Sequence, residues 1–191
     1  MVYFRPPLNF GHENIIKYAN RPYRTVEEMD ADLIRCWNAV VGNSDVVYHL
    51  GDFTLGDVKM AKSYFARLNG TVWMLYNRLH HDKRWLENYA ECVTRSKSSV
   101  LLRDPLEILE LKDYGKDGYP MAVSLCHYPL AEWDRKHYGA WHLHGHSHNN
   151  HVADGLILDV GVDSAAVWLK EYRPFSLEEV AEIMAGKTKP F

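Results

Sequence analysis

Five histidines lie within the eleven residues Trp141–His151, and this cluster constrains the chain more than any other feature. Imidazole is the commonest metal ligand among side chains, because one ring nitrogen can bind an ion while a neighbouring group holds the other. Gly145 allows a tight backbone turn, so His146 and His148, two residues apart, can reach one ion or two neighbouring ions. The cluster therefore predicts a metal site built around His146 and His148.

Two other histidines of the cluster have a simpler interpretation. His142 and His144 alternate with Trp141 and Leu143 in a strand-like run. Alternate residues of a strand point to the same face, so we expect His142 and His144 to decorate its solvent-facing side.

The composition is typical of a globular protein. The chain has 191 residues, 47% of them hydrophobic and 25% charged, which predicts one domain spanning residues 1–191. A net charge of −3 gives no broad basic surface, so we expect nucleic acid only as a substrate. The apolar runs are too short to span a membrane and the first residues resemble a strand, so we expect a cytoplasmic protein. The three cysteines are odd in number and widely separated, which predicts reduced thiols in packing positions: Cys36, Cys92 and Cys126.

Short apolar runs that end in polar residues recur along the chain. The carboxyl ends of strands are where open α/β sheets usually keep their chemistry. A candidate ligand follows each of four predicted strands: Asn9 follows Val2–Arg5, Asp52 follows Asp45–Leu50, Asn77 or His80 follows Thr71–Tyr76, and His127 follows Met121–Leu125.

Helical patterns separate several of these strands. A capping box at Thr25 and Glu28 starts a helix that ends at Gly42, and Asp57 caps a second. Ser176 caps a closing helix through Met184. A hairpin joins Leu106–Leu111 to Met121–Leu125, and Leu156–Val162 is predicted as a final core strand. This alternation predicts an α/β fold.

His81 and Asp82 form a candidate acid–base pair. A carboxylate beside an imidazole fixes its tautomer and raises its pKa, which suits the ring to donate a proton. We therefore expect Asp82 to orient His81. The strand ends supply oxygen and nitrogen ligands together, and this mixture suits zinc, manganese or iron better than calcium.

The order of three motifs resembles that of the calcineurin-like metallophosphoesterases, in particular their small bacterial and phage members. The motifs are YHLGDF at Tyr48–Phe53, SLCHYP at Ser124–Pro129 and HGHSH at His144–His148. The resemblance implies a four-layer α/β/β/α sandwich of two mixed β-sheets flanked by helices. It also implies that a metal-bound hydroxide hydrolyses a phosphomonoester or phosphodiester, with a small phosphoester or nucleotide-type molecule as substrate.

The resemblance further implies a role for each ligand. Asp52 would bridge two divalent transition-metal ions, His127 and His146 would hold one of them, and His148 would hold the other. In this family an Asp-x-His motif follows the first strand, and here Pro7 and Asn9 occupy those two positions. Proline has no ligand atom and an amide oxygen is a weak ligand for these ions. We therefore expect one tightly bound ion and at most a weak second ion.

The family's Gly-Asn-His-Asp motif is also altered, since the chain reads YNRLHHD at Tyr76–Asp82. We assign Asn77 as the ligand and His81 as the proton donor to the leaving group, with His80 as the alternative ligand. Two further functions stay open at this point. One is a degenerate, weakly active or inactive protein that keeps the fold for binding, and the other is a single-metal hydrolase that uses Asp52, Asn77, His127 and His146.

Overall fold

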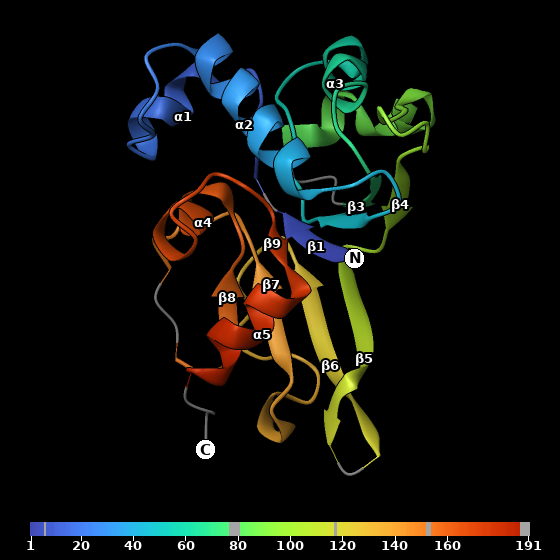
Figure 1. Cartoon of the computed structure of the whole chain (residues 1–191), viewed down its shortest axis with the longest axis vertical. Coiled ribbons are helices and arrows are strands. Elements are labelled where there is room, and N and C mark those ends of the chain that lie inside the picture. Colours follow the sequence, from blue (N-terminus) through green and yellow to red (C-terminus); the bar gives the residue numbers. More distant parts are fainter. Residues whose placement is uncertain (6, 77–80, 117, 152–153, 188–191) are drawn as a thin grey trace.

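Two β-sheets form the centre of the computed structural model, which describes residues 1–5, 7–76, 81–116, 118–151 and 154–187 (Figure 1). The first sheet has the strand order β4-β3-β2-β1-β9, and the second has the order β5-β6-β7-β8. The two sheets with flanking helices confirm the fold predicted from the sequence.

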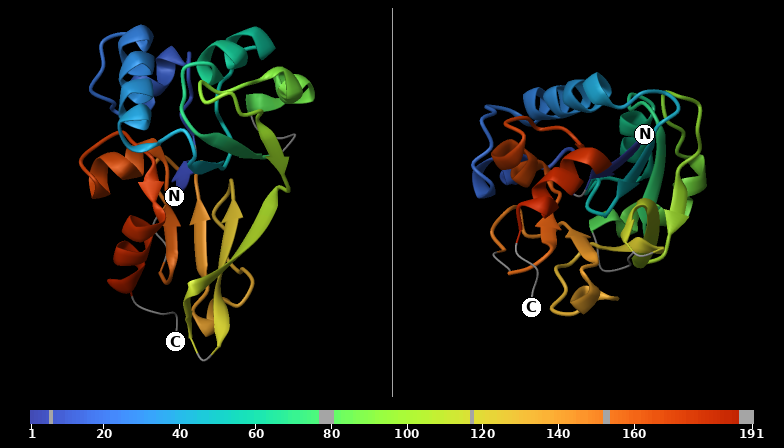
Figure 2. Two further views of the ribbon diagram at one scale, coloured as in Figure 1. Left: turned by 45° about the vertical axis from the view of Figure 1, so that its right-hand side comes forward. Right: turned by 60° about the horizontal axis from the view of Figure 1, so that its bottom comes forward.

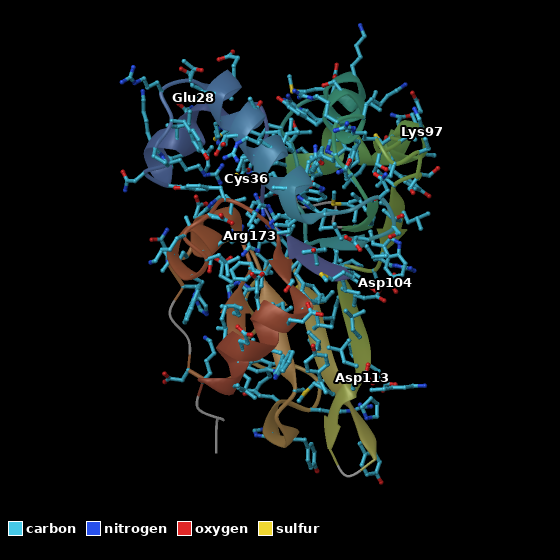
Figure 3. All side chains as sticks on the ribbon, viewed as in Figure 1. Glu28, Cys36, Lys97, Asp104, Asp113 and Arg173 are labelled. Carbon is cyan, nitrogen blue, oxygen red and sulfur yellow. The ribbon has the colours of Figure 1, made fainter. Side chains whose placement is uncertain are left out.

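The first sheet is parallel except at one edge. Its parallel strands are β1 (Val2–Arg5), β2 (Val46–His49), β3 (Thr71–Leu75) and β4 (Leu101–Arg103), and β9 (Phe175–Ser176) is antiparallel to β1. The second sheet has an antiparallel edge strand, β5 (Leu106–Lys116), beside the parallel strands β6 (Tyr119–Cys126), β7 (Trp141–His144) and β8 (Ile157–Asp159). Asp104, labelled in Figure 3, lies where the chain passes from β4 to β5 and so from one sheet to the other.

The helices follow the predicted caps in three places. The Thr25 side chain accepts from the Glu28 amide at the start of α2 (Val26–Val40), and Asp57 caps α3 (Val58–Phe65) in the same way. Ser176 and Glu179 form a capping box at the start of α5 (Leu177–Ala185). Two helices were not expected from the sequence: α1 (Glu13–Tyr18) and α4 (Val162–Trp168). The predicted strand Leu156–Val162 is therefore wrong at its carboxyl end, where α4 begins.

The alternation of side chains along the strands divides the interior into two hydrophobic clusters. Tyr3 on β1 packs in a cluster with residues of α2 and α3, on the side of the first sheet where α1, α2 and α3 lie in Figure 1. Phe4, the next residue, points to the opposite face and packs with Val123 of β6 and Leu143 of β7. Residues of α5 join this second cluster, whose other members come from both of the sheets, drawn from two further sides in Figure 2.

The remaining structure consists of short turns and connections. Three 3-10 helices are η1 (His81–Arg84), η2 (Leu86–Glu91) and η3 (Lys136–Tyr138). The three cysteines are free thiols. In the part of the chain that the structure describes, no helix combines the length and the apolar character needed to cross a membrane.

Candidate metal centre

Asp52 and His127 meet where strands of the two sheets end. Asp52 follows β2, and His127 follows β6. The Nε2 atom of His127 lies 3.4 Å from Oδ2 of Asp52, and both side chains are almost completely buried. The Nδ1 atom of His127 lies 2.8 Å from the carbonyl oxygen of Leu50, which only accepts hydrogen bonds. Nδ1 therefore carries a proton, and Nε2 is the ring nitrogen that faces the Asp52 carboxylate.

His146 completes a group of three ligand atoms. One atom each from Asp52, His127 and His146 lies within 4.8 Å of the other two. The amide of Gly145 donates to the carbonyl of His127 at 3.0 Å, which ties the loop of His146 to the end of β6. The sequence predicted this trio because each of its residues follows a strand, and α/β sheets usually keep their chemistry at the carboxyl ends of strands. The structure adds that Asp52 comes from the first sheet, and His127 and His146 from the second.

The ligand set fits a divalent transition metal. Two ligands of a tetrahedral ion, each bound at about 2.1 Å, stand about 3.4 Å apart, which matches the separation of His127 and Asp52. A carboxylate with two imidazoles is a common protein ligand set for such ions. Asp52, His127 and His146 therefore form a group that can hold a metal ion.

Backbone strain is concentrated around these ligands. Asp52, His146 and His148 have φ values of 56°, 65° and 48°, in the left-handed region that side chains other than glycine adopt at a cost. Asn9 also has a positive φ of 55°, and its amide donates to the Asp52 carbonyl at 3.0 Å. Strain of this kind persists where the surrounding structure over-determines the conformation, and it is frequent at functional sites.

The loop that carries His146 and His148 is held by Asp159, the last residue of β8. Oδ2 of Asp159 accepts from the Ser147 hydroxyl at 2.7 Å and from the Asn149 amide at 2.9 Å. Oδ1 accepts from the Gly161 amide at 2.7 Å. A Cβ at Gly161 would meet this carboxylate at 2.8 Å, so a larger residue there would displace the Asp159 side chain. Asp159 therefore fixes the backbone on both sides of His148.

The chain is similar in sequence to an archaeal protein and to a phage protein. No protein-family model matches it. It is 29% identical over 187 residues to the uncharacterized protein MJ1445 of Methanocaldococcus jannaschii, covering 96% of this chain and 90% of that protein. It is 25% identical over 187 residues to the Gene 66 protein of Mycobacterium phage L5, covering 85% of this chain and 86% of that protein.

One solved structure has the same fold. The crystal structure of AQ665, a protein of unknown function from Aquifex aeolicus, aligns with a TM-score of 0.64. The alignment covers 96% of this chain and 98% of that chain at 20% sequence identity. This likeness establishes the architecture of two sheets and flanking helices.

The predicted second half of the site has an altered set of neighbours. His148 lies outside the group of three ligand atoms, and its Nδ1 atom is 2.7 Å from Oδ2 of Asp163. Pro7 is buried and lies near Gly161, with its Cδ 4.0 Å from where a Cβ of that glycine would stand. Asn9 is buried, and its side-chain nitrogen, Nδ2, has no hydrogen-bond partner among the described residues.

Asp82 does not orient His81 as predicted. Its buried carboxylate accepts from the backbone amides of Phe53 and Thr54 and from the indole of Trp85, at 2.8 to 3.1 Å. Burial raises the pKa of Asp82 to about 6, against the opposing effect of these hydrogen bonds. Asp82 thus holds the turn after Asp52, because backbone amides there need an acceptor that the sheet does not provide.

His81 lies beside the ligands through its backbone. Its amide donates to Oδ1 of Asp52 at 3.2 Å, while its side chain is exposed at the start of η1. An exposed imidazole next to the Asp52 carboxylate can reach a molecule bound there. The other two candidates from this loop, Asn77 and His80, lie outside the described residues.

His142 and His144 are buried, and the prediction that they face solvent is wrong. The Leu130 amide donates to Nε2 of His142 at 3.0 Å, so Nδ1 carries the proton and donates to the Ser124 carbonyl at 2.9 Å. His142 on β7 is therefore hydrogen-bonded both to β6 and to the loop that connects β6 to β7. Burial lowers the pKa of His142 to about 4, which keeps the ring neutral.

Several contributing residues were not found from the sequence. Tyr128 packs edge-on against the rings of both His127 and His146, with 4.7 Å between ring centroids in each pair. It follows His127 directly, so its position in the motif was the only available signal. Asp159 lies inside the run Leu156–Val162 that was predicted as an apolar strand, and Asp163 directly follows that run.

Proposed function

We propose that the chain is a metal-dependent phosphoester hydrolase that holds one divalent transition-metal ion tightly on Asp52, His127 and His146. The observation that carries this proposal is the meeting of one ligand atom each from Asp52, His127 and His146 within 4.8 Å of one another. An ion bound there supplies Lewis-acid charge to a phosphoryl oxygen and lowers the pKa of a coordinated water. The resemblance of the three strand-end motifs to those of metallophosphoesterases supports phosphoester substrates.

The residues of the chain have distinct parts in this proposal. His127 is aimed by its hydrogen bond to the Leu50 carbonyl, and Asp52 by the His81 amide. The exposed His81 ring is the candidate proton donor to the leaving group, and it acts without the carboxylate of Asp82. Zinc, manganese and iron all suit the ligand set, and small phosphoesters or nucleotide-type molecules remain the proposed substrates.

Metal analysis together with turnover of bis(p-nitrophenyl) phosphate tests the proposal. We expect one ion per chain after desalting, and we expect His127→Ala and His146→Ala to lose both the ion and turnover. His137→Ala is the matched control, because its exposed side chain lies on η3, outside the ligand group. Chelation should abolish turnover while the far-ultraviolet circular dichroism stays unchanged. Equal ion loss in all three variants would contradict the assignment.

A second candidate function is binding without catalysis. Pro7 and Asn9 favour it, because they replace the two ligands that would help to hold a second ion. A protein that retains one ion on Asp52 but shows no turnover of phosphomonoesters or phosphodiesters, with added manganese or zinc, would support this candidate.

A further inference from the structure

Three residues from distant segments form a buried network beside the metal centre. Arg21 follows α1, Asp163 lies in the first turn of α4, and His148 lies in the loop after β7. The side chains of Arg21 and Asp163 are 0% and 8% exposed, and that of His148 is 20% exposed. We refer to Arg21, Asp163 and His148 as the Asp163 network.

Arg21 fixes the Asp163 carboxylate through two parallel hydrogen bonds. Nε of Arg21 donates to Oδ1 at 2.8 Å, and Nη2 donates to Oδ2 at 3.0 Å. This two-point arrangement sets the plane of the carboxylate, which a lysine ammonium would not do. Nη1 of Arg21 donates to the Leu8 carbonyl at 3.0 Å. The guanidinium is therefore held on several sides and has little freedom to turn.

The carboxylate in turn defines the tautomer of His148. Oδ2 of Asp163 lies 2.7 Å from Nδ1 of His148. A carboxylate that accepts two hydrogen bonds from an arginine is ionised and only accepts, so Nδ1 of His148 carries the proton. In the neutral ring, Nε2 then has the free lone pair. Carboxylate–histidine pairs orient metal-binding imidazoles in this way.

The backbone around His148 leaves the ring few other positions. His148 and Asn149 both have left-handed φ values, 48° and 62°. Asp159 holds the hydroxyl of Ser147 on one side and the amide of Asn149 on the other. The loop is thus anchored by Asp159 while the ring is anchored by Asp163.

The Asp163 network also reaches the first loop of the site. Arg21 binds the Leu8 carbonyl, and the next residue, Asn9, donates its amide to the Asp52 carbonyl. A continuous set of hydrogen bonds therefore joins His148 to the backbone of Asp52. Arg21 thus connects Asp163, which holds His148, to the loop that carries Pro7 and Asn9.

We propose that Asp163, fixed by Arg21, is a positioning residue that keeps His148 in the Nδ1–H tautomer and presents its Nε2 lone pair to the metal centre. The use of that lone pair, for a cation or for a substrate proton, rests on the proposed function. The tautomer itself requires neither an ion nor a substrate. The altered half of the site therefore keeps one pre-oriented acceptor although Pro7 and Asn9 replace its expected ligands.

Nitrogen-15 NMR of the histidine rings in the metal-free protein tests this inference. Long-range proton–nitrogen correlations distinguish a protonated from an unprotonated ring nitrogen, and the His148→Gln variant assigns the signals. We expect Nδ1 of His148 to carry the proton in the parent protein. In Asp163→Asn, the amide oxygen can take either carboxylate position, and its N–H group faces Nδ1 when it lies at the Oδ2 position, so both tautomers of His148 should be populated.

His142 provides an internal control for the same spectra. Its Nδ1–H tautomer is fixed by Leu130 and Ser124, so it should not change in Asp163→Asn. Should the single variant fail to fold, Arg21→Met with Asp163→Asn removes both buried charges together, which is tolerated far better than leaving one. There we expect both tautomers of His148 to be populated. An Nε2–H tautomer in the parent protein, or an unchanged tautomer in the variants, would overturn the inference.

Turnover separates this inference from the proposed function. If the chain hydrolyses bis(p-nitrophenyl) phosphate, Asp163→Asn should lower kcat about 10- to 100-fold while one ion stays bound to Asp52. A change of tautomer in a protein without phosphoesterase activity would support the Asp163 network and contradict the proposed function.

Discussion

The backbone amide of Phe53 donates to both carboxylate oxygens of Asp82, at 2.9 and 3.1 Å. This contact joins the residue after Asp52 to the start of η1, so a buried charge supports the turn that presents a metal ligand. The same carboxylate accepts from Thr54 and Trp85. Its burial makes the free energy of unfolding depend on pH.

We expect ionisation of Asp82 to destabilise the fold. Burial raises its pKa from 3.8 to about 6, so the folded protein binds this proton more tightly than the unfolded chain. The resulting stabilisation is fully present below about pH 4 and is lost as the pH rises through 6, with a magnitude of roughly 3 kcal/mol. Urea unfolding of Asp82→Asn should remove this contribution. The parent protein should therefore lose stability relative to the variant between pH 4 and pH 7, and a constant difference would contradict the prediction.

His142 should have the opposite effect on stability. Burial lowers its pKa from 6.5 to about 4, and a protonated Nε2 would oppose the amide of Leu130. The stabilisation that the neutral His142 ring gives to the folded state is fully present above about pH 6.5. It is lost as the pH falls toward 4, and its magnitude is again roughly 3 kcal/mol. Relative to His142→Gln, the parent should gain stability between pH 4 and pH 7. Asp82→Asn serves as the control. Between pH 4 and pH 7 the parent protein should lose stability relative to Asp82→Asn and gain stability relative to His142→Gln.

Arg5 is a buried cation that weakens the fold. Its side chain is completely buried and donates to the Tyr172 carbonyl at 3.1 Å, while Nε and Nη1 have no hydrogen-bond partner among the described residues. Burial, followed by the charge of Arg21, lowers the pKa of Arg5 to about 9. Arg5→Met should raise the free energy of unfolding by about 1 to 4 kcal/mol, measured by thermal and urea unfolding. Arg5→Lys is the control, because it keeps the charge and should not raise the free energy of unfolding. If Arg5→Met instead lowers the free energy of unfolding, the fold needs the guanidinium and the prediction is wrong.

The ligand trio was predictable from the sequence because it depends on one rule. Asp52 and His127 each follow an apolar strand, and α/β sheets usually keep their chemistry at the carboxyl ends of strands. The pattern did not show that these two strands belong to different sheets. The partner of His81 was not predictable from adjacency. Asp82 follows His81 directly, but its carboxylate turns toward backbone amides 28 and 29 residues earlier in the chain.

Other features depend on tertiary packing that local patterns do not report. The alternation in β7 shows that His142 and His144 share a face, but it does not show what covers that face. Leu130 reaches His142 only because the loop between β6 and β7 folds back over this face of β7. The network partner Asp163 was missed because the apolar run LILDVGV continues into α4 without a break in composition.

The altered first loop allows a direct test of ligand number. A metal centre of this kind needs about three protein ligands. An ion on Asp52, His127 and His146 would meet that count, whereas a second ion would have only Asp52, His148 and the neutral amide of Asn9. We therefore expect one tightly held ion and low phosphodiester turnover that rises with added manganese or zinc.

Restoring both ligands should complete the second position. Asn9 already has a left-handed backbone that histidine tolerates, and its amide is bonded to Asp52, so Asn9→His introduces an imidazole at a fixed place. Pro7→Asp adds the missing charge. The double variant should retain two ions per chain after desalting and should raise turnover at least about tenfold, because two ions can share the charge of the reacting phosphoryl group.

A matched variant separates charge from shape. Pro7→Asn with Asn9→His has nearly the same side-chain size but lacks the carboxylate, so it should bind the second ion more weakly than the Asp-containing variant. Metal stoichiometry and bis(p-nitrophenyl) phosphate turnover are measured for all three proteins. Two tightly held ions in the unaltered protein would show that residues now in the chain already complete the second position. Asn9 and His148 would then be the first to replace, since the Asp163 network and the Asp52 backbone hold both segments in place.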